Sequence, residues 1–273
     1  MEIKKEIITS KSNPGVTLAA SLSEKKYRDR YGLFKADGFK LAEELFLRKI
    51  MPETVYISEK SIDRVKELNC EIAATVLSDS LFERLSEEKS PEGIICIVKH
   101  LDNLRKIATI DNSGFCPDEW KSGRILLLES VRDPGNLGTV IRSAAALSVD
   151  RLIISADCAD VYNGKTVRAS MGAVFGMKID RVDSLENAVS ALKSQGRRVF
   201  AAALDRTAVG LDRLTLDAGD CFIIGNEGHG LSDDVLDAST GRVFIPIEAG
   251  SESLNAAAAA AIILWEQKRQ LKK

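Results

Sequence analysis

The second half of the chain contains five short aliphatic segments in which polar and apolar residues hardly alternate. They are RILLLES (124–130), RLIISAD (151–157), RVFAAAL (198–204), CFIIG (221–225) and RVFIPI (242–247). Continuous aliphatic runs are typical of parallel strands that helices cover on both faces. Helical patterns accompany them at 137–148, 165–177, 184–195, 232–238 and 254–271. We therefore predict a five-stranded parallel α/β domain whose ligand lies beyond the carboxyl ends of the strands.

The first hundred residues form a separate alternating series. Strand patterns occupy 33–38, 54–58, 71–77 and 93–100, and helical patterns occupy 39–49, 62–68 and 79–86. Periodicity fades between about Leu101 and Gly123, where turn-forming residues gather. We predict a smaller α/β domain over 1–105, a linker over 106–123 and the larger domain over 124–273.

Composition excludes several classes of protein. The 273 residues are 45% hydrophobic and 29% charged, as in ordinary globular domains. No apolar run reaches the roughly 18 to 20 residues of a membrane span, and the start lacks the apolar core of a signal peptide, so we expect a cytoplasmic protein. The five cysteines are scattered without a C-x-x-C pair, which predicts neither disulfides nor a metal site.

Charge is unevenly distributed along the chain. Residues 1–50 hold eleven Lys and Arg against seven Asp and Glu, so they carry +4, while the remainder carries −6 and the whole chain −2. The front of the molecule is therefore the basic end.

Polar, turn-rich loops follow the first, fourth and fifth strands of the larger domain. DPGN (133–136) precedes a helix that Asn136 is placed to cap and that carries Arg142. GNEGHG (225–230) sets Glu227 and His229 among glycines, although a lone histidine is more often a surface residue than a base.

GSESLN (250–255) precedes six alanines. Its Ser251, Ser253 and Asn255 lie where the start of a helix favours an electron-rich group, and the small side chains behind allow close helix packing. Each loop alone could be an ordinary turn or helix cap. Together they predict one pocket that offers backbone amides, a carboxylate, an arginine, hydroxyls and side-chain amides.

NLGTVIRSAAA, IIGNEGHGL and IPIEAGSESLNAAAAAAI, in this order and at these spacings, resemble the three motifs of the SpoU (TrmH) family of SPOUT-class RNA 2′-O-ribose methyltransferases. ITSKSNPGV, KKYRDRYGLF and PEGIICIV resemble signatures of the L30e-like substrate-binding domain that precedes the catalytic domain in this family. The resemblance implies a parallel sheet with a C-terminal trefoil knot, and a homodimer that forms through the knotted domain.

The resemblance also implies a cofactor and a set of site residues. S-adenosylmethionine (AdoMet) would be held, largely by backbone, at Leu204, Gly225, Ile245 and Leu254. The catalytic positions carried over are Asn136, Arg142, Glu227, Ser253 and Asn255. Cations that could bind RNA phosphates are Lys11, Lys25, Lys26, Arg28, Arg30 and Lys35.

The chain departs from the family pattern at Asp37, where Glu is common, and in the alanines after Asn255. We expect methyl transfer to a ribose 2′-hydroxyl, with rRNA favoured over tRNA as the target. Two alternatives stay open: a catalytically silent RNA-binding relative, which the intact motif residues disfavour, and a nucleotide-dependent oxidoreductase, for which DPGNLG is a poor glycine-rich loop. Neither the target nucleotide, the proton acceptor nor the protomer that supplies Arg142 follows from the sequence.

Overall fold

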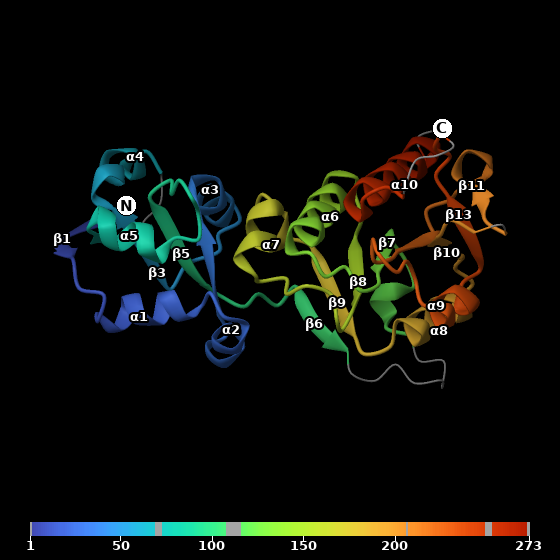
Figure 1. Cartoon of the computed structure of the whole chain (residues 1–273), viewed down its shortest axis with the longest axis horizontal. Helices are drawn as coiled ribbons and strands as arrows, with labels where there is room; N and C mark the ends of the chain where they lie inside the picture. The colour runs from blue at the N-terminus through green and yellow to red at the C-terminus, as the bar shows by residue number, and fades with distance from the viewer. Residues whose placement is uncertain (1, 69–72, 108–115, 206, 249–252, 272–273) are drawn as a thin grey trace. The chain divides into compact units, whose positions relative to one another are not determined.

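The computed structural model describes residues 2–68, 73–107, 116–205, 207–248 and 253–271. These residues form two compact units (Figure 1). The first unit comprises Met1–Leu101 together with Asp160–Phe175, and the second comprises Asp102–Ala159 and Gly176–Lys273. Within the described ranges, no helix is long and apolar enough to cross a membrane.

The first unit is built on a mixed sheet with the strand order β1-β4-β3-β5-β2. β1, β4 and β3 run parallel, while β5 is antiparallel to β3 and β2. The strands are β1 (Glu2–Ile8), β2 (Leu33–Asp37), β3 (Thr54–Ser58), β4 (Ala73–Leu77) and β5 (Ile94–Lys99). The helices of residues 1–101 are α1 (Pro14–Ser21), α2 (Lys25–Tyr31), α3 (Phe39–Leu47), α4 (Ile62–Lys66) and α5 (Asp79–Leu85). The four strands and three helices predicted here are confirmed, whereas β1, α1 and α2 were not predicted.

Residues 160–175 belong to the first unit although the second unit surrounds them in sequence. They contain α7 (Gly164–Ala169), which packs against β2, and Tyr162 stacks on Phe34 with ring centroids 4.6 Å apart. Asp160 accepts hydrogen bonds from Nε and Nη2 of Arg28 at 3.0 and 2.7 Å. The predicted border placed these residues in the larger domain. This assignment differs from the structure because the order of segments in the chain does not indicate which of two cores a returning segment packs into.

The second unit contains a sheet in which every recorded strand pair is parallel, in the order β11-β13-β10-β12-β7-β8-β9-β6. The five predicted strands are its centre, and they are β7 (Ile125–Leu128), β8 (Arg151–Ser155), β10 (Val199–Ala202), β12 (Cys221–Ile224) and β13 (Gly241–Phe244). Three further strands extend it: β6 (Leu104–Ile107), β9 (Lys178–Val182) and β11 (Val209–Gly210). The parallel architecture is confirmed, but the number of strands was underestimated.

Part of the expected linker is integrated into the second unit. β6 pairs with β9, and the buried Trp120 donates its Nε1–H to Oδ2 of Asp180 at 2.7 Å. Arg151 binds the same carboxylate oxygen at 2.7 Å. Asp180 is fully buried, so its charge is stable there only with these partners. The described residues of the expected linker therefore include the end of a short edge strand and an anchored tryptophan, while residues 108–115 lie outside the described ranges.

The remaining α-helices of the second unit are α6 (Pro134–Ala146), α8 (Leu185–Ser194), α9 (Asp233–Ala238) and α10 (Ala256–Leu271). α10 packs along α6, and Figure 1 shows these two helices side by side. Both helices contain buried small side chains, among them Ala144 of α6 and Ala257 and Ala260 of α10. Small residues let two helix backbones approach closely, so α10 places its first turn beside the loop that begins α6.

Candidate active site

The loop after β7 begins α6 one turn earlier than predicted. Asp133 is the N-cap, and its Oδ1 accepts the backbone N–H of Asn136 at 2.8 Å, while Pro134 occupies the first helical position. The prediction that Asn136 caps this helix is therefore wrong. Asn136 lies in the first turn instead, so its side-chain amide is available to other loops.

The loop after β12 is a tight hairpin organised by Asn226. Backbone bonds of 3.0 and 2.9 Å join Asn226 and Gly230, and Oδ1 of Asn226 accepts the N–H groups of Gly228 and His229 at 2.8 and 3.2 Å. Nδ2 of Asn226 donates to the carbonyl oxygen of Ser130 at 2.9 Å, which ties the hairpin to the loop after β7. A Cβ at Gly225 would lie 2.5 Å from the carbonyl oxygen of Gly230, so only glycine fits there.

The third loop leads from β13 into α10. Asn255 caps α10, because its Oδ1 accepts the N–H groups of Ala257 and Ala258 at 2.9 and 3.3 Å. Ser253 and Asn255 are both exposed. Ser251, also expected in this loop, lies outside the described residues. α10 therefore begins at Ala256, two residues after the predicted start, and Asn255 is its cap.

The three loops meet at Glu227. Nδ2 of Asn136 donates to Oε1 of Glu227, and Nδ2 of Asn255 donates to Oδ1 of Asn136 at 3.1 Å and to Oε1 of Glu227 at 3.5 Å. Two amides and one carboxylate from distant parts of the chain therefore form a single hydrogen-bonded cluster. The two amides orient the Glu227 carboxylate, and the exposed side chains of Glu227 and Asn255 stay accessible to a ligand.

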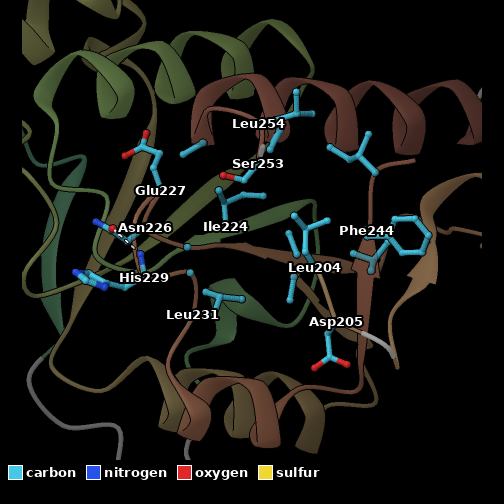
Figure 2. A pocket seen from close by; sticks show the side chains of 18 of the residues that line it. Leu204, Asp205, Ile224, Asn226, Glu227, His229, Leu231, Phe244, Ser253 and Leu254 are labelled. Carbon is cyan, nitrogen blue, oxygen red and sulfur yellow. Dashed lines mark hydrogen bonds between the residues drawn. The ribbon is translucent and has the colours of Figure 1, made fainter. Parts of the chain in front are cut away.

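A cavity of about 370 Å³ lies beside this cluster, between the carboxyl ends of β10, β12 and β13 (Figure 2). All four residues expected to bind the cofactor line it, together with Glu227 and Ser253. They are Leu204, Gly225, Ile245 and Leu254. Figure 2 shows Leu204 and Phe244 toward one end of the cavity and Glu227 and Asn226 toward the other.

The cavity fits a cofactor with an apolar body and a cationic centre. Its volume lies in the usual range of cofactor sites, about 300 to 1,000 Å³. Aliphatic side chains of Ile224, Leu231 and Val243 are among those that line it, as a purine requires, and the Glu227 carboxylate would attract a sulfonium. Among the residues that the structure describes, no cluster of His, Cys, Asp and Glu could hold a metal ion.

Arg142 does not reach this cluster within one chain. It is exposed on α6, six residues beyond Asn136, a spacing that turns it about 240° around the helix from that residue. Within the described ranges its guanidinium has no recorded hydrogen bond or ion pair, and it does not line the cavity. The structure therefore brings together four of the five predicted catalytic residues around the Glu227 end of the cavity and leaves Arg142 apart.

Two of the cations expected to bind RNA serve the interior of the first unit instead. Arg28 is 3% exposed and donates to the carbonyl oxygens of Leu22 and Ser23 as well as to Asp160. Lys35 is 5% exposed, and its Nζ lies 2.7 Å from the carboxylate of Glu87. Removing either cation from its partners would leave a buried charge unpaired. The prediction that Arg28 and Lys35 bind RNA phosphates is therefore corrected. The four expected cations that are exposed are Lys11, Lys25, Lys26 and Arg30.

Sequence reasoning missed the group that holds the loop after β7. Asp157 accepts hydrogen bonds from the hydroxyls of Ser130 and Ser155, both at 2.6 Å, and from Arg132 at 2.8 Å. Desolvation acts to raise the pKa of Asp157, but these bonds outweigh it and lower the pKa to about 2. Ser130 adopts a left-handed backbone conformation with φ 53°, and its carbonyl oxygen accepts the hydrogen bond from Nδ2 of Asn226. No spacing signal marks Asp157, because its partners come from two different strand ends.

Comparisons with known proteins agree with this geometry. A family model described as the SpoU rRNA Methylase family matches residues 123–265, and one described as the MRM3-like substrate binding domain matches residues 13–96. The 23S rRNA (guanosine(2553)-2′-O)-methyltransferase of Bacillus subtilis is 30% identical over 94% of this chain and 97% of its own length. The mitochondrial rRNA methyltransferase 3 of Xenopus laevis is 28% identical over 94% of this chain and 73% of its own length.

A solved structure with its cofactor is also similar. The AdoMet-bound rRNA methyltransferase of Sinorhizobium meliloti superposes with a TM-score of 0.79 at 26% identity, and the match covers 98% of each chain. The resemblance inferred from the three motifs and from the front domain is thereby confirmed. The chain belongs to the SpoU rRNA methylase family and carries an MRM3-like substrate-binding domain in front of the methylase domain.

Proposed function

We propose that this protein is an AdoMet-dependent methyltransferase that modifies a ribose 2′-hydroxyl of rRNA. The observation that carries the proposal is the junction of Asn136, Glu227 and Asn255 at one end of the cavity that the four expected cofactor-binding residues line. Similarity to the B. subtilis 23S rRNA enzyme over nearly the whole of both chains supports rRNA as the target. A silent RNA-binding relative would not need this cluster.

The residues have distinct roles in this proposal. Bound AdoMet would supply an electrophilic sulfonium methyl group. Aliphatic side chains and strand-end backbone of the cavity would bind the adenosine part, and Glu227, oriented by Asn136 and Asn255, would face the cationic end. Ser253 would contact the ribose beside it. Catalysis then depends on alignment of the 2′-oxygen with the methyl group and on stabilisation of developing alkoxide charge.

We propose that the protein acts as a homodimer in which Arg142 serves the active site of the partner subunit. Arg142 is exposed and lies about 120° around α6 from Asn136 in its own chain. α10 also exposes Ile262 (40%) and Trp265 (58%), which are costly to leave in water and could be covered by a second copy. An arginine stays protonated in proteins, so Arg142 would hold a phosphate of the substrate and stabilise negative charge at the 2′-oxygen.

A trefoil knot is also part of the proposal. Residues of the loop Gly225–Leu231 line the cavity together with Ile245, Ile247, Ser253 and Leu254, which come from the two ends of the connection between β13 and α10, as they would if the chain passed through a loop at this point. The exposed cations of the first unit, Lys11, Lys25, Lys26 and Arg30, would contact RNA phosphates. We propose a cytoplasmic location, with which the buried thiols of Cys116, Cys158 and Cys221 are consistent.

The direct test combines calorimetry with methyl transfer. The purified protein should bind AdoMet and transfer a labelled methyl group to rRNA, and the Arg142→Ala variant should lose transfer while it keeps its AdoMet affinity. Absence of AdoMet binding by folded wild-type protein would refute the function. Loss of AdoMet affinity in Arg142→Ala would refute the role of the arginine only.

Mixing two inactive variants tests the dimer. If Arg142 acts across the interface, subunits with Arg142→Ala and subunits with Glu227→Ala should recover about a quarter of wild-type activity when mixed and reassembled, because half of the dimers are mixed and each has one intact site. If Arg142 acts within its own chain, the mixture stays inactive. Reassembled wild-type protein is the control for losses during mixing.

A further inference from the structure

α2 has an outer face of two aromatic and two cationic side chains. Tyr31 is 45% exposed and Tyr27 is half-buried, and their rings are nearly parallel, with centroids 6.3 Å apart and an interplanar angle of 12°. Nζ of Lys26 lies 4.7 Å from the centre of the Tyr27 ring, and Cζ of Arg30 lies 5.5 Å from the centre of the Tyr31 ring. The four residues form one continuous stripe, which we call the α2 aromatic face.

The opposite flank of α2 is anchored in the first unit. The guanidinium of Arg28 donates to the carbonyl oxygens of Leu22 and Ser23 at 2.7 and 2.8 Å and to the carboxylate of Asp160. Gly32 ends the helix in the left-handed conformation with φ 62°. Because its base is fixed, α2 presents Tyr27 and Tyr31 in a set orientation, and little conformational entropy is lost when a ligand stacks on them.

Charge on α2 is arranged so that the aromatic face is positive. Asp29 pairs with Lys25, and the two lie about 160° and about 120° around the helix from Tyr31. The other acidic neighbour, Glu24, lies 2.9 Å from Lys26 in an exposed pair that a phosphate could replace at little cost. Arg30 has no recorded carboxylate partner among the described residues.

We propose that the α2 aromatic face binds an unpaired base of the substrate RNA by stacking on Tyr31, with Tyr27 as the second layer and Lys26 and Arg30 at the flanking phosphates. The proposal rests on the proposed function and adds a recognition site in the substrate-binding unit. Proteins read single-stranded RNA by stacking splayed bases on aromatic rings or guanidinium planes, and they follow the backbone with cations. Paired bases present no free face, so the site should prefer single strands.

The test measures the affinity of the full-length protein for a fluorescent single-stranded oligoribonucleotide and for the same sequence as a duplex, at several salt concentrations. Tyr31→Leu should weaken single-strand binding about tenfold without changing the salt dependence, because stacking is uncharged. Tyr31→Phe keeps the ring and should bind like wild type. Lys26→Gln should reduce the slope of log affinity against log salt by about 0.7.

Matched controls separate stacking from general surface effects. Leu47→Ala removes an exposed apolar side chain of α3 (78% exposed) and should leave RNA affinity unchanged. Thermal unfolding checks that the Tyr31 variants stay folded. Wild-type affinity of the Tyr31→Leu and Tyr27→Leu variants would overturn the inference, as would equal weakening of duplex and single strand.

The inference and the proposed function can fail separately. If wild-type protein binds AdoMet and methylates rRNA while the tyrosine variants do so at wild-type efficiency, the α2 site is wrong and the methyltransferase assignment stands. If RNA affinity is unaffected but a variant no longer binds a copurifying protein, α2 is a protein interface instead. Failure of wild-type AdoMet binding refutes the function itself.

Discussion

The two units use polar groups in opposite ways. In the first unit, Arg28 and Lys35 are buried and their charges are neutralised by neighbours, so their task is to hold α2 and β2 in place. In the second unit, Asn136, Glu227 and Asn255 are bound to one another but accessible, and Arg142 is exposed. Arg28 and the four residues of the second unit all lie in stretches that resemble family motifs, so motif membership alone does not separate groups that stabilise the fold from groups that meet the substrate.

The largest expected effect of a single substitution belongs to the first unit. Arg28→Ala removes the donor to Oδ2 of the half-buried Asp160 and to two carbonyl oxygens, and we expect it to lower the free energy of unfolding by about 3 to 5 kcal/mol. Denaturant unfolding measures this loss, and Arg30→Ala on the same helix should change stability by less than about 0.5 kcal/mol. A stable Arg28→Ala protein with reduced RNA affinity would show that the first unit also uses this cation for its substrate.

The next effect belongs to the active site and should be kinetic. Glu227→Ala removes the acceptor that joins Asn136 to Asn255, so the loops lose their alignment, and kcat should fall about 100-fold. Stability should change little because Glu227 is exposed. Steady-state methyl transfer together with thermal unfolding tests both statements. A large loss of stability at unchanged kcat would make Glu227 a scaffold residue, like Arg28.

The smallest expected effect belongs to a structural carboxylate beside the active site. The pKa of Asp157 is lowered to about 2 in the folded protein, so its hydrogen bonds contribute stability above its unfolded pKa, and this contribution is lost as the pH falls from about 4 toward 2. Asp157→Asn should be less stable than wild type by about 1 kcal/mol or less at neutral pH, since the group is partly exposed.

The measurement for Asp157 is unfolding as a function of pH. The difference between wild type and Asp157→Asn should shrink as the pH falls through this window. A constant difference from pH 7 to pH 2 would show that the carboxylate charge is not what holds Ser130. Asp118→Asn is a suitable control, because that carboxylate is 89% exposed and pairs only locally with Lys121.

Much of the site was predictable from residues that are local in sequence. The loop glycines, the aspartate-proline turn and the alanine run lie next to the strands and helices that they begin or end, so their spacing predicted three loops at one sheet edge. The position of Asn136 in the helix was missed by one turn, because Asp133 and Asn136 are both good caps and only the backbone conformation distinguishes them. The edge strand β6 and its neighbour β9 were missed because their residues carry charges that pair across the sheet, as Arg105 does with Asp180.

The chain order of aliphatic strands and of the loops between them determined the parallel α/β class, the family and the edge at which the cavity lies, since these features depend on hydrophobic period and local turn chemistry. Tertiary structure decided the rest. In the folded protein, residues 160–175 belong to the first unit, and Arg28 and Lys35 are buried. Asn136 is hydrogen-bonded to Glu227, whereas Arg142 is exposed and lies outside this cluster. The reason is that burial and hydrogen bonding depend on residues that meet from distant parts of the chain. The sequence alone does not distinguish a charged side chain that pairs with a carboxylate of the core from one that binds a phosphate of RNA.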